Sequence, residues 1–134
     1  MVKSATFQCA VVTPEQAVLE CEAKFVALPA WDGEIGILRD RAPLLCKLGI
    51  GPLRVETPDE QHVLFVDGGF AEMAENRLTI LTQATRRPDE LDATEVAAAL
   101  ETARGMEVTD DETFQARQKA LRRARVQRKM VGRA

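Results

Sequence analysis

Short runs of β-favouring residues, separated by turn residues about every ten positions, fill the segment Thr6–Thr85. In the first run Phe7, Cys9 and Val11 alternate with their neighbours until Pro14 ends the pattern. Alternation of this kind places one face of a strand in a core. Short strands at this spacing, with no helix-length period between them, predict a β-sandwich or a barrel.

Seven further runs have the same character, and turn-forming sequences separate them. The runs are Ala17–Cys21, Lys24–Leu28, Ile35–Leu38, Leu53–Thr57, His62–Val66, Phe70–Ala74 and Leu78–Thr82. The turn sequences are Asp32-Gly33, Gly49-Ile50-Gly51-Pro52, Thr57-Pro58-Asp59, Asp67-Gly68-Gly69 and Glu75-Asn76. Aromatic residues make up only 4% of the chain, so we expect an aliphatic core.

The pattern changes to a helical one after Pro88. Asp92, followed three residues later by Glu95, is an N-cap signature, because the Asp carboxylate can accept a backbone N–H. The Ala-rich run Ala93–Arg104 favours a helix, and Gly105 is a natural stop. We therefore predict a helix of about 12 residues, roughly 18 Å long.

A second helix follows after a short turn. Thr109 and Glu112 have the spacing of a capping box, and the run continues to about Val131 without Gly or Pro. This predicts a helix of about 21 residues, roughly 32 Å long, that forms a hairpin with the first. The hairpin has few apolar side chains. These are Val96 and Leu100 in the first helix, and Phe114, Leu121, Ala124 and Val131 in the second. So thin an apolar stripe leads us to expect a hairpin that can fold down or open out.

Charge is divided unevenly along the chain. Residues 1–114 hold all 21 acidic and 10 basic side chains, whereas residues 115–134 hold 8 basic side chains and no acidic one. The basic residues are Arg117, Lys119, Arg122, Arg123, Arg125, Arg128, Lys129 and Arg133. Such a tail is typical of a solvated helix end, of a nucleic-acid contact or of a contact with an acidic protein, and the charge pattern alone leaves all three open.

Residues that could carry catalysis are scarce. Cys9, Cys21 and Cys46 include no CxxC pair, and we interpret them as small core residues in a reducing compartment. His62 is the only histidine, and we expect a surface or core role for it. No nucleophile with a partner base, phosphate loop or metal-ligand spacing is present, and no apolar run approaches the roughly 18 residues of a membrane span. We therefore predict no enzymatic activity, cofactor or metal.

Two blocks carry a resemblance to a known family. The segments EIGILRDRAPLL (34–45) and DGGFAEMAENRLTILTQATRRPDELD (67–92) resemble the epsilon subunit of F-type ATP synthases, and VVTPEQAVLECEAKFVALPAWDGE (11–34) fits in spacing. The helical tail matches mainly by length, Ala content and basicity. The resemblance covers nearly the whole chain.

The resemblance implies a mainly β plus α fold with two domains. Residues 1–87 would form a ten-stranded β-sandwich that binds the gamma subunit and the membrane c-ring, and residues 88–134 a regulatory antiparallel two-helix hairpin. The chain would then be a non-catalytic rotor subunit of a proton-translocating enzyme, peripheral on the cytoplasmic side of the bacterial inner membrane. The helices could extend into the alpha/beta hexamer and inhibit ATP hydrolysis.

This interpretation predicts no nucleic-acid partner and only indirect contact with the membrane. The alternative is a free-standing β-sandwich adaptor whose basic helix binds nucleic acid or an acidic protein. Co-purification with a gamma subunit would favour the first interpretation, whereas salt-sensitive binding to generic DNA or RNA would favour the second.

Departures from the family pattern concern two sites. Members usually carry Gly-His before Ala-Pro-Leu-Leu, whereas this chain has Asp40-Arg41. The resemblance places this loop and Glu34 toward the c-ring, although an ordinary charged loop is the plain alternative. The inhibitory helix would act through a basic face formed by Arg117, Arg122, Arg123, Arg125 and Arg128.

An ATP-binding motif of some bacterial members, Ile/Leu-Asp-x-x-Arg-Ala, is degenerate here. Leu91 and Asp92 match it, but Glu95 stands at the Arg position and Val96 at the Ala position. A carboxylate at that position repels phosphate. We therefore predict weak or absent ATP binding and interpret Asp92 as a helix cap.

Overall fold

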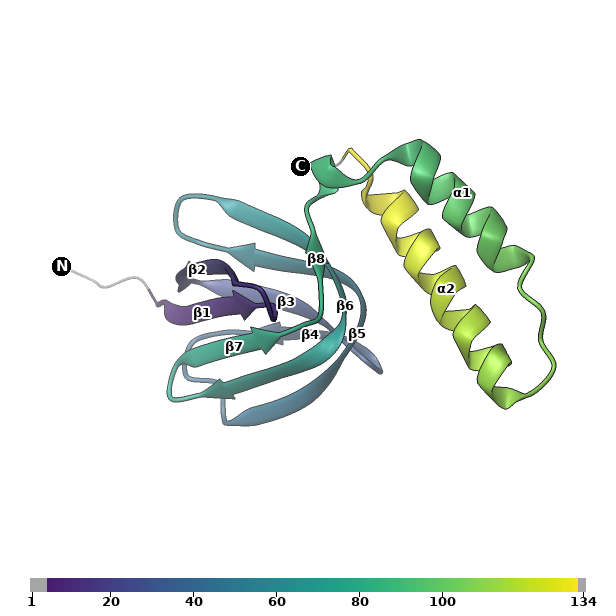
Figure 1. The fold of residues 1–134 in the computed structure, drawn as a ribbon. Helices are drawn as coiled ribbons and strands as arrows, with labels where there is room; N and C mark the ends of the chain where they lie inside the picture. Colours follow the sequence, from purple (N-terminus) through teal and green to yellow (C-terminus); the bar gives the residue numbers. More distant parts are fainter. Residues whose placement is uncertain (1–4, 133–134) are drawn as a thin grey trace. The chain divides into compact units, whose positions relative to one another are not determined.

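A computed structural model describes residues 5–132, and the chain divides between Thr85 and Arg86 into two compact units (Figure 1). The first unit is built of strands β1 (Phe7–Val12), β2 (Ala17–Ala23), β3 (Phe25–Ala30), β4 (Gly33–Ile37), β5 (Leu44–Glu56), β6 (Gln61–Ala74) and β7 (Arg77–Leu81). The short strand β8 (Thr85–Arg86) follows, and a 3-10 turn (Pro88–Glu90) then leads to helices α1 (Ala93–Arg104) and α2 (Asp111–Met130).

The strands follow the order β2-β1-β7-β6-β5-β3-β4, with β8 beside β6. Neighbours in this path are antiparallel except β1 and β7, which run parallel. The N-terminal half of β5 pairs with the C-terminal half of β6, which continues to β7, whereas the C-terminal half of β5 pairs with β3. The two long strands thus pass from one layer to the other, which closes the sheet into a sandwich (Figure 1).

The predicted β-sandwich followed by two helices is confirmed, but the expected number of ten strands is corrected to eight over residues 5–132. Strands β5 and β6 contain 13 and 14 residues and run unbroken through sites where we expected turns. Each of them serves both layers, so a fold that could be built from ten short strands needs only eight.

The glycines at those two sites allow backbones to approach closely instead of reversing the chain. Gly69 has a φ of +114°, and a Cβ atom there would overlap the carbonyl oxygen of Leu81. A Cβ on Gly49 would lie 3.0 Å from the carbonyl oxygen of Ala30. The predicted turns at Gly49–Pro52 and Asp67–Gly69 are therefore wrong, because these glycines meet neighbouring strands.

The core of the β unit is aliphatic, as expected from the composition. Leu28, Ile37 and Leu53 are among its fully buried side chains, and Phe7 is the one aromatic member of the main buried cluster. Alternation within β1 buries Phe7 and Val11 on the same face as Cys9. The inner faces of both layers thus supply the apolar surface that drives folding.

The predicted first helix is confirmed with its cap. Asp92 Oδ1 accepts the N–H groups of Thr94 and Glu95 at 2.7 and 3.1 Å. The second helix has 20 residues, close to the predicted 21. Its cap lies one residue later than predicted, because Asp110 Oδ1 accepts the Thr113 N–H at 2.8 Å and Thr113 Oγ1 accepts the Asp110 N–H at 3.1 Å.

The two helices hold each other through a small apolar cluster. Leu100 and Ala103 of α1 and Leu121 and Ala124 of α2 are buried in it. Phe114, which we expected in this stripe, leaves 43% of its surface exposed. The contact between α1 and α2 therefore rests on fewer large side chains than the sequence suggested. Within residues 5–132, no helix has the length and apolar character needed to cross a membrane.

Candidate protein interaction surfaces

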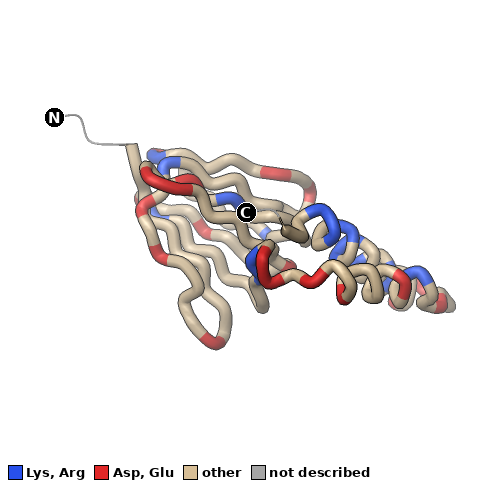
Figure 2. The backbone as a smooth tube through the Cα atoms, turned by 90° about the horizontal axis from the view of Figure 1, so that it is seen from above, with Lys and Arg blue, Asp and Glu red and all other residues tan. Residues whose placement is uncertain are grey.

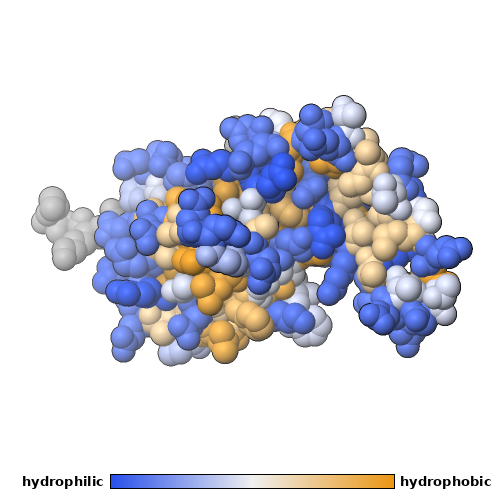
Figure 3. All heavy atoms as spheres, viewed as in Figure 1, coloured by the Kyte–Doolittle hydropathy of each residue, from blue (hydrophilic) through white to orange (hydrophobic). Residues whose placement is uncertain are grey.

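An exposed apolar patch, here called the apolar sheet face, is formed by Leu45, Phe70 and Leu81. Phe70 of β6 and Leu81 of β7 are direct cross-strand partners and are 54% and 52% exposed. Leu45 of β5 is 71% exposed and lies opposite Glu72, which places it diagonally beside Phe70 on the same face. Figure 3 shows hydrophobic residues gathering where β1 and β7 lie. Clustered exposed apolar side chains mark a contact surface.

Our sequence reasoning did not single out the apolar sheet face. The signal was nevertheless present, because Leu44 and Leu45 are consecutive in one strand and must point to opposite faces. Leu44 packs against the core and Leu45 faces outward. Only the register of β6 and β7 shows that Phe70 and Leu81 share that outward face.

The loop after β4 is fixed by the turn between β6 and β7. Asn76 Oδ1 accepts the Asp40 N–H at 2.6 Å, and Asn76 Nδ2 donates to Asp40 Oδ1 at 2.9 Å. Both residues have left-handed backbones, with φ of 65° and 59°, which Asp and Asn tolerate well. Arg39 Nε lies 3.8 Å from the Asp40 carboxylate. Two predicted site residues, Asp40 and Arg41, thus sit on a loop with a defined conformation.

A shallow hollow beside this loop combines apolar and charged side chains. Its lining consists of Ala5, Lys24, Phe25, Leu38, Arg39, Asp40 and Pro58. The guanidinium of Arg54 lies 5.8 Å from the centre of the Phe25 ring, a cation–π distance. Leu38 is largely exposed, so the loop offers an apolar contact between charged ones.

Glu34, the third residue predicted for this site, lies at the other end of β4. It is exposed and opposes Pro29 near the β3–β4 turn. The extended strand from Glu34 to Ile37 alone places about 10 Å between its ends. Glu34 and Asp40 therefore do not form one cluster, and any partner that contacts both must be broad.

The basic face predicted on the second helix is present on α2. Arg122, Arg125 and Arg128 are exposed, whereas Arg117 and Arg123 are half-buried. Arg117 Nη2 donates to the Arg104 carbonyl oxygen at 3.3 Å, which satisfies a free acceptor at the end of α1. Figure 2 shows Lys and Arg concentrated along α2. Arg133 lies outside the described residues.

Part of the basic face forms a stripe with helical spacing. Gln118, Arg122, Arg125, Val126 and Lys129 line one shallow hollow along α2. Positions 118, 122, 125 and 129 repeat at intervals of three and four residues, so their side chains follow one line. Guanidinium and ammonium groups in a row favour carboxylate or phosphate groups as partners.

The residues at the positions of the degenerate nucleotide motif have structural roles. The Asp92 carboxylate caps α1, and the side chains of Leu91 and Val96 are buried. Glu95 is exposed and places a second carboxylate in the first turn of the helix. These residues do not fit a triphosphate group, because the motif's cation is replaced by an anion. The absence of ATP binding stays a prediction.

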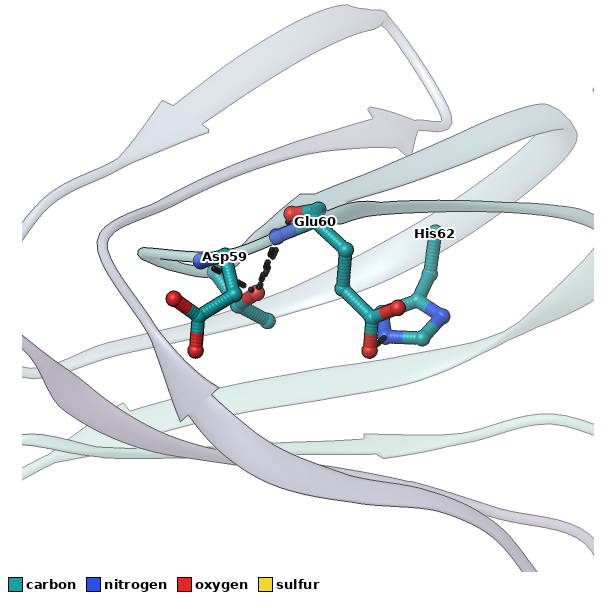
Figure 4. A network of polar contacts seen from close by, with 4 residues as sticks. Asp59, Glu60 and His62 are labelled. Carbon is teal, nitrogen blue, oxygen red and sulfur yellow. Dashed lines mark hydrogen bonds and ion pairs between the residues drawn. The ribbon is translucent and has the colours of Figure 1, made fainter.

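His62 takes part in a turn network at the β5–β6 hairpin (Figure 4). Its Nε2 atom lies 3.1 Å from Glu60 Oε1, while Thr57 Oγ1 accepts the Glu60 N–H at 2.9 Å and the Asp59 N–H at 3.3 Å. This network stabilises the hairpin turn. Among residues 5–132, no three His, Cys, Asp or Glu side chains are grouped to hold a metal ion.

The three cysteines are free thiols in the β unit. Cys9 is buried in the core of the β unit. Cys21 and Cys46 are half-buried and pack against this core. Burial raises the pKa of Cys9 to about 12. Burial likewise raises the pKa of Cys46, with the nearby Asp32 carboxylate adding to the effect.

Comparisons with known proteins identify relatives along most of the chain. Residues 6–88 match the family described as ATP synthase, Delta/Epsilon chain, beta-sandwich domain. An ATP synthase epsilon chain of Rhodopirellula baltica is 43% identical over 122 residues, which cover 91% of this chain and 95% of that protein. One of Synechococcus elongatus is 39% identical over 127 residues, covering 91% and 92%.

Solved structures share the fold at lower sequence identity. A chain in the Euglena gracilis mitochondrial ATP synthase, from a structure of OSCP, F1 and the c-ring, has a TM-score of 0.82 and 22% identity, covering 90% of this chain and 78% of that one. A chain from the central stalk and c-ring of the Tetrahymena thermophila enzyme has a TM-score of 0.71 and 17% identity, covering 96% and 98%.

Proposed function

The chain belongs to the ATP synthase delta/epsilon family, and on this premise we propose that it is a non-catalytic rotor subunit that couples gamma to the membrane c-ring. The observation that carries the proposal is the 43% identity to an epsilon chain across both the β unit and the helical unit. The two solved structures of the same fold come from an assembly of OSCP, F1 and the c-ring and from one of the central stalk and c-ring, which supports the same partners here.

The apolar sheet face is our candidate for the gamma contact. Leu45, Phe70 and Leu81 offer adjoining apolar side chains on a rigid sheet, and the central part of a permanent interface is of this kind. Strand pairing holds the backbone of all three residues in place, so little order is lost when a partner binds. Burying this face would also remove exposed apolar surface from water.

The loop with Asp40 and Arg41, together with Glu34, is our candidate for the c-ring contact. The Asn76 bonds hold the loop in one shape, which suits a contact that must transmit torque. Arg41 and Glu34 are exposed and of opposite charge, at separate places on the β unit. Through the ring, the chain would be peripheral on the cytoplasmic side of a bacterial inner membrane and would take part in proton-driven ATP synthesis.

The helical hairpin is our candidate for a conditional inhibitor of ATP hydrolysis. The α1–α2 contact rests on a small cluster around Leu100 and Leu121, so separating the helices exposes little apolar surface. Opened into one rod, residues 92–131 would reach roughly 60 Å. The basic face of α2, with Arg122, Arg125 and Arg128, would then suit an acidic surface of the alpha/beta hexamer.

Binding to gamma tests the proposal at its first step. The tagged full chain should co-purify with co-expressed gamma, and Phe70→Glu should weaken the complex at least tenfold, because a desolvated charge in an apolar contact costs well over the roughly 1.4 kcal/mol that a tenfold change represents. Val108→Glu is the matched control, since Val108 is also an exposed apolar residue but lies in the helical unit.

Retention of full affinity by the Phe70→Glu chain would exclude the apolar sheet face as the gamma contact. A wild-type chain that ignores gamma but binds generic DNA through residues 109–134, with strong salt dependence, would instead support the adaptor interpretation.

A further inference from the structure

Cys9 and Cys21 are direct partners across the antiparallel strands β1 and β2. The pairing is not evident from the sequence, because eleven residues, which include a turn, separate the two cysteines. Residues at directly opposite positions are the closest that two strands offer, so the register alone brings these thiols together.

The backbone hydrogen bonds that β1 makes on its β7 side show which kind of antiparallel pair Cys9 and Cys21 form. Gln8 N–H donates to the Asn76 carbonyl oxygen at 2.9 Å, and the Val12 carbonyl oxygen accepts the Thr82 N–H at 3.0 Å. Even-numbered residues of β1 thus direct their backbone groups toward β7, so Cys9 directs its own toward β2. The cysteines form a hydrogen-bonded antiparallel pair, whose Cα atoms lie about 5.5 Å apart. This spacing is within the roughly 4.4–6.8 Å range of disulfides.

The surroundings give a reagent access to one of the two thiols. Cys21 lies on β2, the strand at the end of the sheet path, and is only half-buried there. Both side chains lie on the face of the sheet that packs against the core, where Cys9 is buried and Cys21 is half-buried. A reagent that reaches this edge of the sheet therefore meets Cys21 first, with Cys9 on the next strand.

We propose that Cys9 and Cys21 are a redox modification site, which a small-molecule disulfide converts to a cross-strand disulfide joining β1 and β2. The Cys21 thiolate attacks one sulfur of the reagent, forming a mixed disulfide and releasing the first small thiol. Cys9 loses its proton to solvent, and its Sγ attacks Cys21 Sγ, which releases the second small thiol. The protein loses two electrons and two protons, and the reagent disulfide becomes two thiols.

Cys46 does not belong to this site. It lies on β5 opposite Ala71, and β6 and β7 separate β5 from β1. Three strand spacings of about 4.8 Å place it roughly 14 Å from β1, beyond the reach of a disulfide. Cys46 therefore serves as an internal control.

The test uses the folded full chain, without denaturant, and 2-hydroxyethyl disulfide as the probe. This reagent is neutral, which avoids repulsion by Glu20 and Glu22, the exposed neighbours of Cys21. After oxidation, iodoacetamide should label Cys46 alone, and the protein mass should be lower by two hydrogen atoms before labelling. Peptide mapping should recover Cys9 linked to Cys21, and dithiothreitol should release them.

Two variants separate the site from chance oxidation. Cys46→Ser should form the same disulfide, whereas Cys21→Ser, checked for folding by circular dichroism, should leave Cys9 reduced under the same conditions. Burial raises the pKa of Cys21, so the rate should rise about tenfold per pH unit between pH 7 and 9. Three labelled cysteines in the wild-type chain, or a mixed disulfide that persists on Cys21, would overturn the proposal.

Discussion

Gly68 and Gly69 stand side by side in β6 with left-handed backbones, yet only Gly69 is pressed against another strand. A Cβ on Gly68 would have no heavy atom within 4 Å, whereas a Cβ on Gly69 would overlap the carbonyl oxygen of Leu81. Both glycines have a positive φ, +73° at Gly68 and +114° at Gly69, so a side chain would strain the backbone at either position. Only at Gly69 would it also overlap a neighbouring strand. This contrast separates backbone strain from steric overlap.

We predict that Gly69→Ala destabilises the β unit by about 3 kcal/mol or more, because strain and overlap add. Gly68→Ala should cost only about 1–2 kcal/mol, the penalty of a left-handed non-glycine residue. Urea unfolding of both variants measures the difference. Equal losses of unfolding free energy in the two would contradict the close approach of β6 and β7.

The residue types in the sequence indicated an unusual backbone conformation at these glycines. They did not indicate that it serves a close approach between strands. A Gly-Gly pair preceded by Asp favours a reversal, and we predicted one. The deciding fact is the position of Leu81, twelve residues after Gly69 in the chain, on a neighbouring strand. Non-local contacts of this kind also decide that Phe70 and Leu81 share a face, and that Cys9 meets Cys21.

At the scale of elements, helix α2 depends on its first turn. Thr113 donates its backbone N–H and its hydroxyl to Asp110 Oδ1, at 2.8 and 2.9 Å. These two bonds lower the pKa of the Asp110 carboxyl, the backbone bond most. Both Thr109-Glu112 and Asp110-Thr113 have the spacing of a cap, and the structure uses the second. Local sequence placed the helix correctly and could not choose between adjacent caps.

The Asp110 cap gives α2 a pH dependence with a defined sign. Because the pKa is lower in the folded chain, the stabilisation is fully present above the unfolded value of 3.8 and is lost as pH falls through the lowered value. Hydrogen exchange at the Thr113 amide should accelerate over this acidic range relative to a distant α2 amide. Asp110→Asn keeps a capping oxygen but cannot titrate. A variant with the same acid-induced step as the wild type would exclude Asp110 as its source.

The contact between α1 and α2 yields a second prediction at this scale. Leu121 is buried between the helices, so Leu121→Ala should destabilise the helical unit by about 2–5 kcal/mol. Phe114→Ala, a larger truncation of an exposed side chain, should change stability by less than about 0.5 kcal/mol. Far-UV circular dichroism during urea unfolding follows both. A larger loss of unfolding free energy for Phe114→Ala than for Leu121→Ala would show that Phe114 belongs to the apolar stripe, as expected from the sequence.

At the scale of the whole molecule, charge is divided between the two parts of the chain. The acidic residues lie N-terminal to position 115, and α2 carries the basic face. Under the proposed function, the β unit, with its apolar sheet face and fixed loop, would serve permanent assembly, and the helical unit would serve regulation. Helical and strand periods in the sequence could predict both units. The surfaces required the register and the burial of single residues, which sequence periods do not specify.

The most direct test of this account is the ATP hydrolysis rate of the reconstituted complex with the full chain and with a chain ending at Val108. Without residues 109–134, gamma binding and coupled ATP synthesis should persist, and hydrolysis should rise severalfold because the basic helix can no longer enter the hexamer. Arg122→Ala with Arg125→Ala in the full chain should raise hydrolysis in the same direction. Unchanged hydrolysis in the truncated complex, with assembly intact, would contradict the assignment of the helices as an inhibitor.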